Sequence, residues 1–443
     1  MSHLNLLRPH RRLLSRRASP GSAALFAIGT LWGLLALLVG STPSLAQTVV
    51  LEADRMLDVR TGEILAEVTL LIEDGRIAAI NPTTLPAVAP IDLGDVTLLP
   101  GFMDAHTHLA YDISGDWTLR PVTETAADAA IRGVRNARRT LEAGFTTVRD
   151  VGSTGFADVA LMHAIDKGMV PGPRIIPAGY SLSITGGHCE DTGWAPGVLE
   201  RDYRTGVADG PWEAVAAVRY QIKHGARVIK ICATAGVLSF EGPVGAQQFT
   251  LEEMEAIVEE AERHGVRVAA HSHGTDGIKA ALRAGVTSIE HGSVLDDEAI
   301  ALFLEHGAYH VPTSCLVDKL DIAGLPDGPR QKAEFVLPLA REGLRRSIAA
   351  GVKIAFGTDA GVFTHGENAC EMAVYVDHGM TPLEAIQSAT LVNAELFGVD
   401  DRGALEPGML ADIVAVPGNP LDDIRVTEDV VFVMKGGEVV VRR

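Results

Sequence analysis

Two histidines separated by a single residue, His106 and His108, end an apolar run that begins at Leu98. In an extended strand, residues i and i+2 point to the same side, so both imidazoles can bind one metal ion. An isolated pair of this kind is more often two ordinary surface or core histidines. A metal site is favoured here because more potential ligands follow at the ends of later apolar segments, namely His271, His291 and Asp359.

Lys230 is the unusual member of this set, since an ammonium group cannot bind a cation. It lies inside the apolar segment VIKIC, where a charged amine needs a buried partner. Spacing alone leaves a buried salt bridge and a role in the site equally open.

The segments that carry these residues repeat one pattern. A helical stretch ends in Ala-Gly or His-Gly, and an apolar strand follows. Glycine just past a helix adopts the left-handed conformation that lets the chain turn into a strand. The pattern occurs six times, in segments that end at Asp150, Ile231, His271, His291, Thr313 and Asp359. A strand from Leu98 and another over residues 174–178 bring the number of strands to eight.

Eight strands that alternate with helices predict an α/β fold of the (β/α)8 TIM-barrel class. Barrel strands deliver their C-terminal ends to one face, so ligands that are distant in the sequence would meet there, as in a catalytic metal site. An open doubly wound sheet is the alternative. It would carry a glycine-rich loop after its first strand, where this chain has His-Thr-His.

The two ends of the chain read as short strands with tight turns. Residues 68–80 place Asp74-Gly75 between two apolar runs, and residues 430–441 do the same with Gly436-Gly437, which is typical of β-hairpins. These ends predict a small β-sandwich built from both. The expected domains are a signal peptide over 1–46, the sandwich over 47–100 and 399–443, and the barrel over 101–398.

The first 46 residues have the composition of a secretory signal peptide. Five arginines precede an apolar run over 23–39, and Ser44-Leu45-Ala46 follows as a small-residue cleavage site. A membrane anchor is the alternative, but the run is short for a span and contains Gly29 and Gly33. We expect cleavage after Ala46, export to the periplasm or the medium, and no stable membrane association afterwards.

The chain is acidic, with a net charge of −19. Removal of residues 1–46 takes away five arginines and no acidic residue, so the mature chain carries −24. Nucleic acids and anionic membranes are therefore poor partners. We expect instead a small-molecule substrate and assembly as a homo-oligomer.

The four cysteines, Cys189, Cys232, Cys315 and Cys370, lie far apart and form no CxxC motif. Nothing in this spacing indicates a disulfide framework or a zinc ribbon. We expect buried thiols that pack as small apolar side chains.

The residues described above resemble those of the amidohydrolase superfamily. The HxH pair, the strand lysine, the two later histidines and the aspartate match its binuclear pattern one by one, and segments 379–398 and 403–416 resemble its closing helix and its return to the β-sandwich. In that pattern the lysine is N-carboxylated and bridges two divalent metal ions. Zinc is the expected metal, although cobalt and manganese would suit the same ligands.

The resemblance also assigns roles to residues. His106, His108, Lys230 and Asp359 would hold the more buried ion, and Lys230, His271 and His291 the more exposed one. A hydroxide bridging the ions would be the nucleophile, and Asp359 would move its proton to the leaving group. His273, as the nearby histidine, would assist the oxyanion.

Within the superfamily the chain is most similar to the prolidase-like, imidazolonepropionase-related branch, which includes Xaa-Pro dipeptidases and enzymes that hydrolyse ochratoxin A. Segments 183–191 and 356–368 carry this likeness. It implies hydrolysis of a peptide or peptide-like amide with release of a C-terminal amino acid. A hydrolase or deaminase of a cyclic amide, lactone or imidazolone is the alternative, but deaminases usually lack the carboxylated lysine. A non-catalytic binding protein would lack ligands, and here none is missing.

A substrate that ends in a free carboxylate needs hydrogen-bonding or cationic groups beside the metals. The expected substrate-binding residues are His188, His365 and, at the mouth of the barrel, Tyr111. His273 is a further candidate, because it lies two positions beyond His271 on the same side of the strand.

Overall fold

The computed structural model of the chain describes residues 48–115 and 117–443. The expected signal peptide lies outside these residues, so its presence and cleavage remain predictions. Among the described helices, none has both the length and the apolar character that a membrane span requires.

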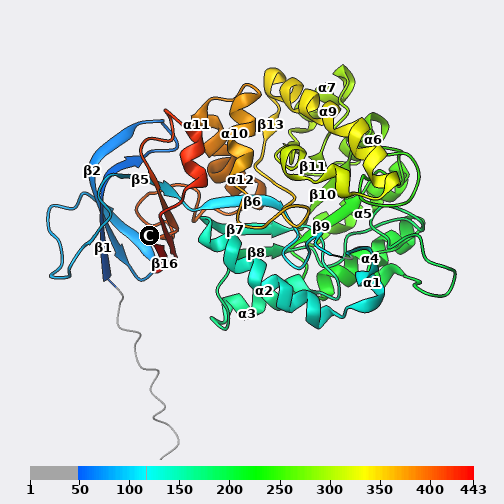
Figure 1. Cartoon of the computed structure of the whole chain (residues 1–443), viewed down its shortest axis with the longest axis horizontal. Helices are drawn as coiled ribbons and strands as arrows, with labels where there is room; N and C mark the ends of the chain where they lie inside the picture. Colours follow the sequence, from blue (N-terminus) through cyan, green and yellow to red (C-terminus); the bar gives the residue numbers. More distant parts are fainter. Residues whose placement is uncertain (1–47, 116) are drawn as a thin grey trace, which may run out of the picture. The chain divides into compact units, whose positions relative to one another are not determined.

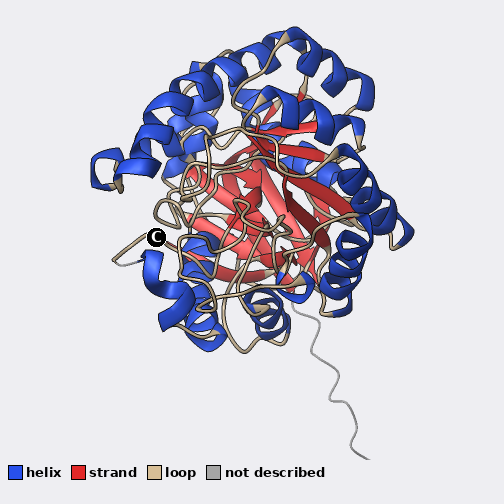
Figure 2. Cartoon of the chain, turned by 90° about the vertical axis from the view of Figure 1, so that its right-hand side faces the viewer, coloured by secondary structure: helices blue, strands red, loops and turns tan. Residues whose placement is uncertain are grey.

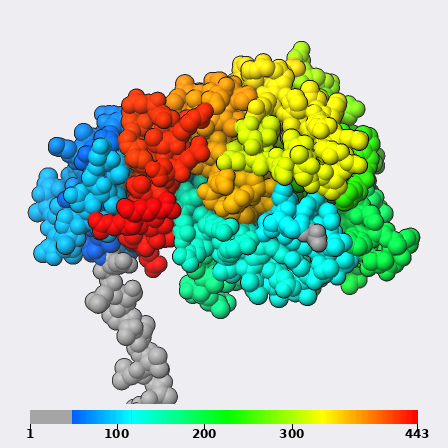
Figure 3. Space-filling view, viewed as in Figure 1, coloured from blue at the N-terminus to red at the C-terminus, as the bar shows by residue number. Residues whose placement is uncertain are grey.

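Strands from both ends of the chain form one eight-stranded sheet. Its order is β16-β15-β14-β5-β1-β2-β3, with β4 beside β1, and Figure 3 shows the first described residues (blue) beside the last residues of the chain (red). The strands are β1 (Thr48–Leu57), β2 (Ile64–Glu73), β3 (Arg76–Ile80), β4 (Ile91–Asp92), β5 (Val96–Pro100), β14 (Ile413–Pro417), β15 (Phe432–Lys435) and β16 (Glu438–Arg442).

Both predicted hairpins are confirmed. Asp74 and Gly75 join β2 to β3 with φ of 50° and 77°, and Gly436 and Gly437 join β15 to β16 with φ of 56° and 81°. Two consecutive residues with positive φ match the right-handed twist of the flanking strands.

The middle of the chain supplies eight strands that pair only in parallel, in two sheets ordered β6-β7-β8 and β13-β12-β11-β10-β9. They are β6 (Phe102–Thr107), β7 (Phe145–Asp150), β8 (Arg174–Pro177), β9 (Val228–Cys232), β10 (Arg267–Ser272), β11 (Ser288–His291), β12 (Tyr309–Val311) and β13 (Lys353–Ile354). The α/β class and the eight predicted strands are thus confirmed. One detail is wrong: the run from Leu98 to Leu109 is two strands, because the chain breaks at Gly101, where a Cβ would collide with Thr146.

Further backbone hydrogen bonds lie at the edges of the two parallel sheets. Ala105 N donates to Phe356 O at 2.8 Å on one side, and Leu182 N donates to Lys230 O at 2.7 Å on the other. Figures 1 and 2 show the strands inside and the helices around them. The helices are α1 (Arg120–Thr123), α2 (Ala126–Glu142), α3 (Ala157–Asp166), α4 (Pro211–Lys223), α5 (Leu251–Arg263), α6 (Thr275–Arg283), α7 (Asp297–His306), α8 (Leu316–Lys319), α9 (Asp327–Ala350), α10 (Cys370–Asp377), α11 (Pro382–Gln387) and α12 (Asn393–Phe397).

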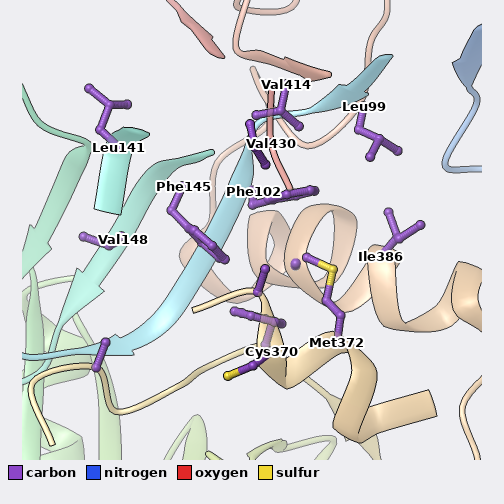
Figure 4. Close-up of a cluster of buried hydrophobic side chains, with 14 of the residues drawn as sticks. Leu99, Phe102, Leu141, Phe145, Val148, Cys370, Met372, Ile386, Val414 and Val430 are labelled. Atoms are coloured by element: carbon purple, nitrogen blue, oxygen red, sulfur yellow. The ribbon is translucent and has the colours of Figure 1, made fainter. Parts of the chain in front are cut away.

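An aromatic cluster joins the first parallel strands to the eight-stranded sheet (Figure 4). Phe145 lies between Phe102 and Phe356, with ring centroids 5.6 Å and 5.5 Å apart, and Val414 of β14 packs into the same cluster. Burying each such side chain contributes roughly 1.5–3 kcal/mol. This core fixes the strand that carries His106 and His108.

The expectation of free thiols is wrong. Cys189 pairs with Cys232, and Cys315 pairs with Cys370, with Cα atoms 5.9 Å and 6.0 Å apart. The partners are 43 and 55 positions apart, so only the fold shows that they are neighbours.

Candidate active site

His106 of β6 and His108, which directly follows β6, meet Asp359, which follows β13. The Nε2 atoms of the two histidines lie 3.5 Å and 3.4 Å from Asp359 Oδ1. One potential ligand atom from each residue lies within 4.8 Å of the other two. The first and the last of the parallel strands, β6 and β13, therefore carry one candidate metal group at their C-terminal ends. This agrees with the expectation that these ends meet at one face.

A second group consists of His271 of β10, His273 directly after β10, and His291 of β11. Their potential ligand atoms also lie within 4.8 Å of one another. The His106 and His291 ring centroids are 5.0 Å apart, so the two groups are adjacent. His273 stacks on His291 at 4.8 Å and thus lies among the histidines expected to be ligands.

Lys230 of β9 lies at the first group, with Nζ 3.5 Å from His106 Nε2. Within the described residues, no carboxylate is close enough to form an ion pair with this amine, although the side chain is buried. Burial lowers the pKa of Lys230 to about 8. The structural alternative, a buried salt bridge, is therefore not what the described residues form.

Glu290 is a buried residue that the sequence analysis missed. Its Oε2 lies 2.8 Å from His106 Nδ1, and its Oε1 accepts a 2.8 Å hydrogen bond from Arg149. Ser288 Oγ also donates to Oε1, at 2.5 Å. The carboxylate that pairs with Arg149 only accepts hydrogen bonds and cannot donate one. His106 therefore carries its proton on Nδ1 and directs Nε2 towards Asp359. An acidic residue inside the apolar strand SIEH was the available signal.

Three other histidines also form a hydrogen-bond contact through Nδ1. His108 Nδ1 lies 3.0 Å from the Gly152 carbonyl, His273 Nδ1 lies 2.8 Å from Ser293 Oγ, and His291 Nδ1 lies 2.8 Å from Thr313 Oγ1. Within the described part of the chain, His271 Nε2 is buried without a hydrogen-bond partner. These contacts leave the second ring nitrogens free to bind a ligand.

Burial also keeps these imidazoles neutral, which is the form that binds metals. It lowers the pKa of His108 to about 4 and that of His273 to about 3, and it moves the pKa of His106, His271 and His291 well below the usual value. Burial raises the pKa of Asp359 to about 7, although the nearby Lys230 ammonium opposes the rise.

The backbone is strained at the same place. Among the described residues, His291, Thr313 and Asp359 adopt positive φ of 69°, 51° and 61° without being glycine. Such conformations persist where the surrounding structure dictates them, often at functional sites. Neutral imidazoles, a carboxylate and an unpartnered ring nitrogen together form a donor set suited to divalent ions such as zinc.

Both groups open into one cavity of about 400 Å³. One wall is apolar and is formed by Val237, Leu238, Phe240, Leu316, Leu320, Leu337 and Val362. The rest of the lining is largely polar and aromatic, and it includes Tyr111, Trp117, Arg120, Arg132, His188, Trp194 and Arg201. Of the expected substrate-binding residues, Tyr111 and His188 line the cavity. Two of the arginines lie in α1 and α2, Leu316 and Leu337 lie in α8 and α9, and the other members lie in loops. None of these segments carries a recognisable motif.

His365 does not line this cavity. It is buried beneath the loop that follows β6, with Nε2 3.2 Å from the His108 carbonyl and 3.4 Å from the Tyr111 carbonyl. His365 thus lacks the place in the cavity lining that a substrate-binding residue needs, and its contacts instead position the backbone of two residues that do line the cavity. A lone histidine in a loop gives no signal that separates these roles.

Comparison with known proteins agrees with this geometry. A family model described as "Amidohydrolase family" matches residues 97–440. The chain is 36% identical to ochratoxinase from Aspergillus niger over 367 residues, which are 77% of this chain and 75% of that protein. It is 27% identical to imidazolonepropionase from Deinococcus deserti over 402 residues, covering 82% of this chain and 88% of that one.

A solved Xaa-Pro dipeptidase, with methionine bound in its active site, has the same fold. It superposes with a TM-score of 0.84 at 39% sequence identity, over 89% of this chain and 99% of the dipeptidase.

Proposed function

Because this chain belongs to the amidohydrolase family and is a hydrolase of amide C–N bonds, we propose that it releases the C-terminal amino acid from a peptide or peptide-like substrate. The observation that carries this proposal is that two groups of metal-binding side chains open into one cavity of about 400 Å³. That volume is in the range of sites for dipeptide-sized ligands. Methionine in the related dipeptidase and the ochratoxinase relative favour the same substrate class.

We propose that the site holds two divalent ions, zinc being the expected metal. His106, His108 and Asp359 would bind one ion and His271 and His291 the other, with N-carboxylated Lys230 bridging them. Divalent ions in such sites polarise a carbonyl and bring the pKa of water down to about 7. The buried, unpaired amine of Lys230 supports carboxylation, because a pKa near 8 gives the neutral form that adds to carbon dioxide.

The chain's own groups would then act on the substrate. Asp359 would accept a proton and return it to the leaving nitrogen. His273 would donate a hydrogen bond from Nε2 to the carbonyl oxygen, with its Nδ1 accepting from the Ser293 hydroxyl. The free carboxylate would be held in the polar lining. Arg120, Arg132 and Arg201 each pair with an acidic side chain and keep further N–H donors, and Tyr111 lies beneath Arg120.

The apolar wall supports a preference for aliphatic or aromatic side chains over basic ones. Three of its members, Val237, Leu238 and Phe240, come from one loop, and Phe240 is half exposed at 51%. An ochratoxin-like amide, which joins an aromatic acid to an amino acid, suits such a wall.

The alternative is hydrolysis or deamination of a cyclic amide, lactone or imidazolone. The imidazolonepropionase relative supports it, at lower identity than the ochratoxinase. Lys230 argues against a single-metal deaminase.

The proposal also includes the closure of the two sheet regions, the export of the protein and its oligomeric state. The edge hydrogen bonds support closure of the eight parallel strands, over residues 101–398, into a (β/α)8 barrel. The sheet built from 47–100 and 399–443 would fold over as a β-sandwich. We also propose export with cleavage after Ala46, and a homo-oligomer; the N-terminal sequence and the mass in solution of the secreted protein test these.

The function is tested by amino-acid release from dipeptides and N-acyl amino acids with aliphatic, aromatic, basic or proline C-termini, and from ochratoxin A. The zinc-loaded mature protein should release aliphatic and aromatic residues, and the Lys230→Met variant should release none. Absence of release across the panel, with two zinc ions bound per chain, would overturn the proposal in favour of the cyclic substrates.

A further inference from the structure

The loop after β9 supplies part of the apolar wall of the cavity. Residues 236–244, here called the wall loop, leave and rejoin the fold at two backbone hydrogen bonds: Ala235 N donates to Ala246 O at 2.8 Å, and Gly245 N donates to Ala235 O at 2.9 Å. Among the described residues, no backbone hydrogen bond joins residues 236–242 to another segment. Side chains must therefore hold this part of the loop in place.

One lysine supplies an anchor from outside the loop. Lys332 of α9 donates to the carbonyls of Gly236, Ser239 and Glu241, at 3.2 Å, 3.0 Å and 2.6 Å. These three bonds use all the donors of one ammonium group. Inside the loop, the Glu241 carboxylate accepts from Gly236 N–H at 3.1 Å and from Ser239 Oγ at 2.6 Å, and Ser239 Oγ also lies 2.6 Å from His188 Nδ1. Residues 236–241 are thus one unit, tied to α9 through Lys332.

The unit that Lys332 holds belongs to an apolar cluster drawn from distant segments. Val237 and Leu238 share this cluster with residues that follow β6, β12 and β13 and with residues of α9, namely Ile113, Leu316, Leu320, Leu325, Leu337 and Val362. Leu337 lines the cavity and lies on the same helix as Lys332, so one helix supplies both the anchor and part of the lining. The cluster therefore presents to the cavity a surface that a hydrocarbon group can contact.

We infer that Lys332 is a positioning residue that sets the specificity of the cavity: by holding residues 236–241, it completes an apolar compartment for a hydrocarbon side chain or ring of the ligand. Without the ammonium group, three carbonyls of one short loop lose their shared donor and regain hydrogen bonds only by turning towards water. Val237 and Leu238 would then leave the cluster. Among the described residues, Lys332 forms no hydrogen bond with the proposed metal ligands, so metal binding should persist. The inference rests on the proposed function only for the reaction that the ligand undergoes.

The first test measures the anchoring of the wall loop and needs no substrate. The zinc-loaded mature protein is treated with chymotrypsin, and cleavage after Phe240 is followed by mass spectrometry. In Lys332→Met, which keeps an unbranched side chain but no donor, this cleavage should be at least about 10-fold faster than in wild type, because the loop opens more often. Lys319→Met is the matched control, since Lys319 forms only an exposed pair with Glu367. An unchanged rate in Lys332→Met would overturn the inference.

The second test measures the compartment by calorimetry with 3-phenylpropionate and propionate, two carboxylates that differ by a phenyl ring. Wild type should bind the first more tightly, and Lys332→Met should reduce this preference about 10-fold at unchanged zinc content, because the ring loses apolar contact. Lys332→Arg keeps a cation with several N–H donors and should restore part of the preference. Leu238→Ala should reduce it without faster cleavage after Phe240, which tests the compartment even if Lys332→Met does not fold. No preference in wild type, or equal weakening of both ligands in Lys332→Met, would overturn the inference.

Three substrates then show which half of the ligand the compartment takes. N-acetylphenylalanine carries its ring on the released amino acid, N-benzoylglycine carries it on the acyl group, and N-acetylglycine has none. A loss of kcat/KM in Lys332→Met confined to the first places the released side chain in the compartment, and a loss confined to the second places the acyl group there. An equal loss on all three would contradict the inference. No hydrolysis of any of them by wild type, with the preference for 3-phenylpropionate intact, would count against the proposed function and leave the compartment standing.

Discussion

Glu290 is expected to support the metal site and the fold at once, and the two roles can be separated. The carboxylate binds His106 and Arg149 on different oxygens, and the side chains of all three residues are at most 3% exposed. In Glu290→Gln one oxygen becomes an NH₂ group. Whichever way the amide turns, that NH₂ faces an N–H donor of His106 or of Arg149.

The structure gives the size of both effects. Arg149 would be left as a buried cation without an anionic partner, which costs about 3–5 kcal/mol of unfolding free energy. Loss of the charged acceptor behind a metal-binding histidine typically lowers metal affinity about 10–100-fold. The matched control, Glu298→Gln, breaks only exposed ion pairs with Lys279 and Arg283 and should cost no more than about 1 kcal/mol.

Urea unfolding and chelator competition for zinc measure the two quantities. In the double variant Glu290→Gln/Arg149→Met the buried cation is gone, so much of the stability should return while the zinc affinity stays low. Unchanged zinc affinity in Glu290→Gln would refute the orienting role of the carboxylate. Recovery of zinc affinity in the double variant would show that Glu290 acts only through the fold.

Three further predictions follow from individual sites. Lys230→Ala should abolish turnover and lower the zinc content from two towards one ion per chain; full activity with two zinc ions bound would exclude the bridging role of this lysine. Asp158 is a buried carboxyl whose pKa burial raises from 3.8 to about 6, so the unfolded state loses this proton first and stability declines as pH rises from about 4 to 6. The unfolding free energy of Asp158→Asn relative to wild type should therefore increase across that window, and a flat difference would contradict the assignment. Replacing Cys315 and Cys370 by serine removes a cross-link over 55 positions and should lower the unfolding free energy by about 4 kcal/mol on the loop-entropy model; insensitivity of wild-type unfolding to reductant would show that this disulfide is absent.

Local patterns in the sequence were sufficient to predict the elements of the fold. The Asp74-Gly75 and Gly436-Gly437 hairpins depend on backbone conformations that glycine and its neighbour supply by themselves. Six of the eight parallel strands follow from apolar runs after helix-ending glycines. Because parallel strands present their carboxyl ends together, the positions of His106, His108, Lys230, His271, His291 and Asp359 predict that they lie at one face. Spacing left the role of Lys230 open, and the family resemblance supplied it.

The tertiary structure decided the contacts that no local pattern encodes. His106 and Glu290 are 184 positions apart, and His188 and Ser239 are 51 apart. The two disulfide pairs and the placement of His365 beneath the loop after β6 also depend on residues that are distant in the sequence. The sequence by itself determined which side chains lie at strand ends, since strand periodicity and helix caps are local. Only the packing of distant segments decided which atoms orient those side chains, because burial and hydrogen bonding depend on neighbours that the chain brings together when it folds.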